Sequence, residues 1–132
     1  EVPQGESIGE TEEKDGAVKI VLTKEGKEYV LKYKIDEIKI KILAKWDGFW
    51  RIVMFDIPER KRIARDALRR RLRKLGFKEL QKSVFVFPHP CRDEIDFIVE
   101  VFEIRPYVRY GELKDITNEA ELKLYFQKAS II

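Results

Sequence analysis

Asp56 is the residue of this sequence that is best placed to take part in a reaction. It follows the apolar run WRIVMF at positions 50–55, and a strand that ends in aspartate is a good place for chemistry. The chain has one cysteine, Cys91, and one histidine, His89. A structural zinc site would therefore lack ligands, and any metal must be bound by oxygen atoms. The alternative interpretation is that Asp56 caps the following helix or turn, with Pro58 setting that turn.

A basic segment at positions 60–74 is the second candidate for function. At helical spacing, four arginines of this segment fall along one stripe: Arg62, Arg65, Arg69 and Arg73. Such a stripe can bind the phosphates of nucleic acid. Four phosphate contacts would give a log–log salt dependence with a slope of roughly −4, at about −0.9 per contact. The alternative is a solvated face balanced by the acidic segment at 93–103 or by a second subunit, because the stripe has no interleaved aromatic residues for base stacking.

Other residues that could do chemistry have simpler structural interpretations. His89 lies between two prolines, which is typical of an exposed turn. Cys91 has no neighbouring base and is expected to begin a helix. Ser83 lies among apolar residues of a predicted strand, where we expect a structural hydrogen bond. Trp46 and Trp50 are expected to anchor the core or to contact the N-terminal segment.

The hydrophobic pattern after Trp46 predicts the elements that must position these residues. They are a strand at 50–55, a helix at 60–75 ended by Gly76, strand material at 77–87, a helix from about 92 to 102, a strand at 106–110 and a final helix capped by Thr117. Whether 77–87 is one bent strand or two is left open. With two strands, the order is that of an α+β protein with the ferredoxin-like βαββαβ sandwich.

The residues before this domain form a different kind of segment. Positions 1–16 are polar and are expected to be exposed, AVKIVL at 17–22 predicts a strand, and IDEIKIKI at 35–42 alternates like another. Thr23 can cap a short helix between the two. We therefore divide the chain into an N-terminal segment and linker at 1–45 and a domain at 46–132.

Composition indicates a folded, soluble, highly charged protein. The 132 residues are 44% hydrophobic and 39% charged, with a net charge of +3, and they suffice for one core of ordinary size. No apolar run approaches the ~20 residues that span a bilayer, and no signal peptide opens the chain. We therefore expect a cytoplasmic protein without a membrane partner.

The strand at 50–55 predicts a covering for both faces of its sheet. Trp50, Ile52 and Met54 must point away from Arg51, Val53 and Phe55, and both sets contain large apolar residues. The face without helices is expected to pack on the N-terminal segment, the C-terminal helix or a second copy of the chain. The sequence therefore favours a homodimer.

Three strings resemble the central domain of PaaX-type transcriptional repressors: WRIVMFDIPE, the basic helix followed by LGF, and LQKSVFVFP. That domain is itself similar to the small CRISPR-associated adaptation endonucleases. Upstream, VKIVLTKEGKEYVLKY resembles the wing strand and following helix of a winged-helix domain. The resemblance implies a DNA-binding regulator for which acyl-CoA is a possible effector. In the endonucleases, the residue matching Asp56 is proposed to hold a divalent ion between two subunits.

Three functions remain open from the sequence. The leading hypothesis is a non-enzymatic, homodimerising domain of a PaaX-like transcriptional regulator, without a cofactor. The alternative is a Mg²⁺-dependent endonuclease of the CRISPR adaptation type, in which Asp56 from two subunits binds the metal. The third is a non-catalytic scaffold that binds protein through its open sheet face or edge.

Overall fold

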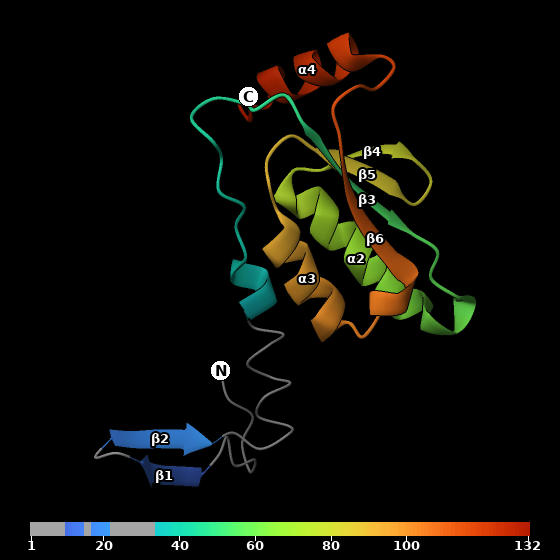
Figure 1. The fold of residues 1–132 in the computed structure, drawn as a ribbon. Coiled ribbons are helices and arrows are strands. Elements are labelled where there is room, and N and C mark those ends of the chain that lie inside the picture. The colour runs from blue at the N-terminus through green and yellow to red at the C-terminus, as the bar shows by residue number, and fades with distance from the viewer. Residues whose placement is uncertain (1–9, 15–16, 22–33) are drawn as a thin grey trace. The chain divides into compact units, whose positions relative to one another are not determined.

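The computed structural model describes residues 10–14, 17–21 and 34–132, which divide into two compact units, 1–38 and 39–132. In the first unit, β1 (Glu10–Lys14) pairs antiparallel with β2 (Ala17–Val21) (Figure 1). The strand predicted at 17–22 is confirmed, whereas β1 lies in a stretch that the polar composition did not mark as a strand. The strand predicted at 35–42 is wrong, because residues 34–37 are helical and 38–43 have no regular structure. The helix expected after Thr23 lies outside the described residues.

The second unit is an α+β domain with a four-stranded antiparallel sheet in the order β4-β5-β3-β6. Its regular elements are β3 (Trp50–Phe55), α2 (Arg62–Leu75), β4 (Lys78–Gln81), β5 (Val84–Phe87), α3 (Arg92–Val101), β6 (Val108–Leu113) and α4 (Glu119–Lys128). Short 3-10 turns, η1 (Glu59–Lys61) and η2 (Arg105–Tyr107), precede α2 and β6. Figure 1 shows α2 and α3 together on one face of the sheet. No helix within the described residues is long and apolar enough to cross a membrane.

β3 is an interior strand, as its continuous apolar sequence predicts. It pairs with β5 on one side and with β6 on the other. Trp50 and Val53 are fully buried although they point to opposite faces. Asp56 directly follows β3 and therefore lies at the end of an interior strand.

The stretch from Phe77 to Phe87 is a hairpin of two strands. Gln81 pairs with Val84, so Lys82 and Ser83 form the turn, and Ser83 has a φ of 67°. A left-handed serine is uncommon, and no Gly, Asn or Pro signals the turn. Ser83 therefore lies in a turn and not in a strand, where the sequence placed it.

Both sheet-covering helices form as their apolar patterns predict. α2 buries Leu68 and Leu72, and Gly76 ends it in the left-handed conformation with a φ of 103°. Its N–H donates to the carbonyls of Arg73 and Leu72, which is the usual glycine end of a helix. α3 begins after Cys91, as expected, and buries its predicted apolar face.

The last strand and helix begin later than predicted. β6 starts at Val108 because residues 105–107 form η2. α4 starts at Glu119, preceded by Asn118 with a φ of 61°, so Thr117 does not cap it. Leu122 and Phe126 are buried, whereas the neighbouring Tyr125 is 42% exposed.

The face of the sheet opposite α2 and α3 is partly covered by α4. The rings of Phe126 and Trp50 lie 5.8 Å apart, and Trp50 Nε1 donates to Glu119 Oε1 at 2.8 Å. Of the three coverings expected for this face, the C-terminal helix is therefore present. Beyond the helix, Met54 and Leu113 remain 42% and 43% exposed.

Candidate functional site

Asp56 has an exposed side chain at the end of the central strand. Its backbone N–H donates to the carbonyl of Tyr107 at 2.9 Å. The residues that precede η1 and α2 are Pro58 and Lys61. The Asp56 side chain forms no hydrogen bond or ion pair with any of the described residues. The capping interpretation is therefore wrong, and the carboxylate is available to solvent.

Two shallow pockets meet at Asp56 and share the hairpin turn, Lys82 and Ser83. One, of about 470 Å³, extends over Met54 toward the start of β6, where Tyr107 and Arg109 line it. The other, of about 430 Å³, extends along α2 and is lined by Glu59, Arg65, Asp66 and Arg69. Cationic and anionic side chains are mixed in both. Neither pocket therefore has a single sign of charge with which to select a ligand.

The donor set around Asp56 does not fit a magnesium site within one subunit. Among the described residues, no group of three or more His, Cys, Asp or Glu side chains could hold a metal ion. Mg²⁺ requires near-octahedral oxygen coordination, which one carboxylate cannot organise without further fixed ligands. Metal binding at this position would need further ligands from outside the described residues, for example from a second copy of the chain.

Each arginine of the predicted nucleic-acid stripe has a carboxylate partner. Arg62 and Arg65 approach Glu59 at 3.8 and 3.1 Å. Arg69 and Arg73 approach Glu79 at 3.2 and 3.0 Å. The structure thus brings the four arginines together, as predicted. The balancing charges come from η1 and β4, whereas one of the two interpretations of the sequence was a balance by the acidic segment at 93–103 or by a second subunit.

Arg69 and Arg73 of the stripe also pack against aromatic rings of the sheet. Arg69 donates to Ser83 Oγ at 3.0 Å, which confirms the structural hydrogen bond expected for this serine. The guanidinium of Arg69 lies 5.3 Å from the centre of the Phe55 ring, and that of Arg73 lies 5.7 Å from the Phe85 ring. Stacking of this kind keeps long side chains against the sheet. Arg69 is therefore held against the sheet, whereas the side chains of Arg62 and Arg73 remain largely exposed.

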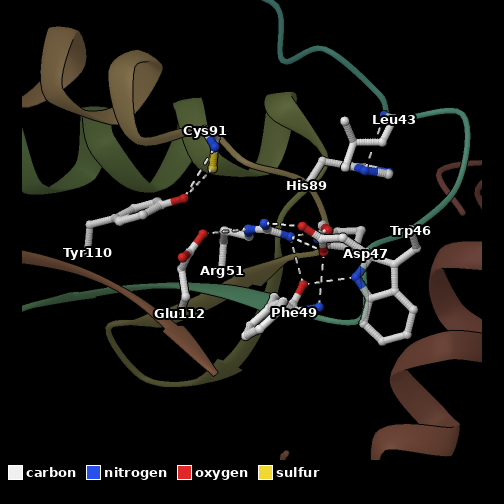
Figure 2. Close-up of polar contacts among 10 residues, drawn as sticks. Leu43, Trp46, Asp47, Phe49, Arg51, His89, Cys91, Tyr110 and Glu112 are labelled. Atoms are coloured by element: carbon white, nitrogen blue, oxygen red, sulfur yellow. Dashed lines mark hydrogen bonds and ion pairs between the residues drawn. The ribbon is translucent and has the colours of Figure 1, made fainter. Parts of the chain in front are cut away.

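A buried polar network surrounds Arg51, for which the sequence analysis gave no role. The side chain is 3% exposed and forms two bonds with the Asp47 carboxylate, at 2.7 and 2.6 Å. It also donates to Glu112 at 3.0 Å and to the carbonyls of Phe49 and Pro88 at 2.9 Å. Figure 2 shows its guanidinium between the two carboxylates. A signal existed in the sequence, since Arg51 is the single charge within β3 and Asp47 precedes it by four residues.

The network fixes the charges of its members. Burial alone would lower the pKa of Arg51, but hydrogen bonds to Asp47 and Glu112 outweigh burial and raise it. The bonds from Arg51 also lower the pKa of Asp47 below its ordinary value. Both groups are therefore ionised at neutral pH. Their role is to join the segment before β3 to β6 and to the end of β5.

His89 and Cys91 are both buried beside this network (Figure 2). The expectation that His89 is exposed is wrong, because its ring accepts from Leu43 N–H at 3.3 Å and lies 2.7 Å from the Ile131 carbonyl. Burial raises the pKa of Cys91 to about 12, so its thiol is not a nucleophile at neutral pH. Burial likewise raises the pKa of the neighbouring Tyr110 to about 12.

Both tryptophans are structural, as expected. Trp50 is fully buried. Trp46 lies against it with ring centroids 4.6 Å apart, and the Trp46 Nε1–H donates to the Phe49 carbonyl at 2.9 Å. They fix the segment that leads into β3.

Comparison with known protein families matches residues 43–124 to the PaaX protein central Cas2-like domain. The chain belongs to this family. The match covers more than half of the sequence and includes Asp56, the arginine stripe and the network of Arg51. No curated protein and no solved structure matches the chain. The resemblance drawn from WRIVMFDIPE and LQKSVFVFP is therefore confirmed for the PaaX central domain.

Proposed function

We propose that this chain carries a homodimerising, non-enzymatic regulatory domain of a PaaX-like transcriptional regulator. The observation that carries the proposal is the match of residues 43–124 to the PaaX central domain. We also infer a ferredoxin-like fold, which the strand order β4-β5-β3-β6 and the common face of α2 and α3 support.

The uncovered part of the sheet is the surface that we assign to the second subunit. Met54 lies on the central strand and Leu113 on its neighbour β6, and both are exposed. They line a groove of about 500 Å³ between the sheet and α4, together with Ile52, Val84 and Leu122. Large apolar residues exposed on a sheet face indicate an interface, and a two-fold axis would let one such patch cover another.

Light scattering of the purified chain tests this assignment. We expect the mass of a dimer for the wild type and of a monomer for Met54→Glu, because the new charge would be buried in the interface. Ile63→Glu is the matched control, since Ile63 on α2 is more exposed and lies outside the groove. A wild-type monomer at high concentration would contradict the proposal.

A Mg²⁺-dependent endonuclease is the second candidate function, because the Asp56 carboxylate is exposed at the end of β3. A symmetric pair of such carboxylates is the minimum that this chain could offer a metal. We expect no cleavage of DNA or RNA by highly purified protein with Mg²⁺. Cleavage by the wild type that is abolished in Asp56→Asn would favour the nuclease hypothesis over the regulator hypothesis.

Other parts of the proposal depend on the family resemblance. Sequence-specific DNA binding is assigned to a winged-helix domain, of which positions 18–33 resemble the end, and acyl-CoA is the effector class that the resemblance implies. A cytoplasmic location follows for a regulator of this type. A scaffold that binds other proteins through the same groove is the third candidate, and a monomer that captures a peptide there would favour it.

A further inference from the structure

His89 is a buried titratable side chain that the proposed function does not use. Its exposed fraction is 0%, and it lies at the exit of β5, against Phe87 with ring centroids 5.8 Å apart. One ring nitrogen, Nδ1, accepts from the backbone N–H of Leu43, and the other, Nε2, lies 2.7 Å from the carbonyl oxygen of Ile131. These partners are 46 and 42 residues away along the chain. One imidazole thus joins two segments that are remote in sequence.

The two contacts define the tautomer of the ring. A carbonyl oxygen can only accept, so Nε2 must carry the proton, and Nδ1 must then be the acceptor for Leu43. A neutral imidazole has one donor and one acceptor, and both are used. Withdrawal of either segment would leave a buried polar atom without its partner, which is unfavourable.

The two joined segments also face each other across a pocket. We call residues 43–49 the lead-in segment and residues 130–132 the tail segment. Lys123 of α4 lies over the Trp46 ring, with its Nζ 5.4 Å from the centroid. A pocket of about 590 Å³ separates the two and is lined by Leu43 and Trp46 on one side and by Ile131 on the other. The two segments are therefore bridged by His89 and separated along the pocket.

The tail segment is seated tightly at the other side of the histidine. A Cβ placed on Gly76 would approach the Ile131 side chain and the Phe87 ring at 3.1 Å each. The Ile131 N–H donates to the Phe126 carbonyl at 2.9 Å, and Phe126 anchors α4 against Trp50. A displacement of the tail segment therefore reaches α4, the helix that covers part of the second sheet face.

We propose that His89 is a clasp that couples the lead-in segment to the tail segment and α4. Release of one segment weakens the hold on the other, because both bind opposite sides of the same buried ring. The clasp transmits a displacement of the chain entering the domain to the helix that borders the open sheet face. This is a coupling between two segments through one shared element.

Amide hydrogen exchange of the full chain tests the clasp. In Ile131→Ala the tail segment loses its packing on Gly76 but keeps the backbone carbonyl. We expect faster exchange at residue 131 and, through His89, an acceleration of about tenfold at Leu43. Lys128→Ala, at an exposed position of α4, is the control and should leave the exchange rate of the Leu43 amide unchanged. Faster exchange at residue 131 with the wild-type rate at Leu43 would overturn the proposal.

Two further measurements apply if Ile131→Ala leaves the tail segment in place. In His89→Phe, the amides of Leu43 and Ile131 should both accelerate relative to the amides of β3, and acceleration of only one of them contradicts the coupling. The nitrogen spectrum of the wild-type imidazole should show the proton on Nε2. A proton on Nδ1 would contradict the clasp, because that tautomer cannot accept from Leu43.

Discussion

At the scale of single residues, the guanidinium of Arg51 organises the end of the sheet. It lies in the interior with partners from the lead-in segment, from β6 and from the chain after β5. Arg51→Met fills a similar volume but leaves the Pro88 carbonyl and the Asp47 and Glu112 carboxylates without the Arg51 donor, whereas the Phe49 carbonyl keeps its bond from Trp46 Nε1–H. We expect the free energy of unfolding to fall by about 3 kcal/mol, toward the lower end for a broken buried pair because both carboxylates are partly exposed.

Urea denaturation measures this loss. Asp47→Asn is the milder control, because its side chain is one-third exposed and asparagine still accepts hydrogen bonds. An unfolding midpoint of Arg51→Met equal to that of the wild type would mean that the network has no structural role.

The pH dependence of stability has a defined sign at Asp47. The pKa of its carboxyl is lower in the folded protein than the ordinary 3.8, so the folded state binds its proton less readily than the unfolded state. Its stabilisation is fully present above pH 3.8 and is lost as pH falls through the lower, folded pKa. The difference in stability between wild type and Asp47→Asn, measured by denaturation at several pH values, should therefore shrink below about pH 4. A difference that grows in acid would contradict the assignment.

At the scale of elements, two glycines with positive φ allow the energetic cost of backbone strain to be distinguished from that of steric clash. Gly76 ends α2 with a φ of 103°, and an added Cβ would meet Ile131 and Phe87. Gly48 has a φ of 89°, and nothing lies within 4 Å of its added Cβ. Gly48→Ala should cost about 1 kcal/mol from backbone strain, and Gly76→Ala should cost more because contact is added to strain. Thermal unfolding of both variants gives the comparison, and equal losses would show that the contact at Gly76 relaxes freely.

At the scale of the whole molecule, we expect the ion pairs on α2 to weaken any binding of nucleic acid by the arginine stripe. Glu59 and Glu79 offset about half of the charge of the four arginines, because each carboxylate is shared by two of them. We expect non-specific DNA binding with a salt-dependence slope smaller in magnitude than the roughly −4 of four free arginines. Fluorescence anisotropy at several salt concentrations measures it.

Removal of the two carboxylates should reverse this effect. Glu59→Gln combined with Glu79→Gln should strengthen DNA binding and steepen the slope, because the arginines become free for phosphates. Glu121→Gln, on the exposed surface of α4, changes one charge away from the stripe and serves as a control. A wild-type slope near −4 would show that phosphates displace the carboxylates readily.

Much of the fold could be predicted because its signals are local. WRIVMF has no polar alternation, which indicates a strand buried on both faces, and α2 shows apolar residues at helical spacing before Gly76. The hairpin turn at Ser83 and the start of α4 after Asn118 could not be placed. In both cases a residue other than glycine takes a positive φ. Ser83 has no strong turn signal, whereas Thr117 and Asn118 are both good helix caps, so the sequence did not decide which of them precedes the helix.

The candidate site was predictable only in its parts. Asp56 was expected at the end of a strand and lies there, and the four arginines share one helix face. Which carboxylates meet them depends on Glu59 and on Glu79, the second of which comes from a neighbouring strand. Charge pairing across elements has no spacing rule along the chain, so it had to be seen in the structure.

The sequence by itself determined the family, the α+β class and the interior strand, because hydrophobic periodicity and helix-end signals depend on residues that are close together in the sequence. The tertiary structure alone decided that His89 is buried, that Arg51 joins three segments and that α4 covers Trp50. These features bring together residues about 40 to 70 positions apart. Burial and polar partners are properties of the packed chain, and they become defined when distant segments meet.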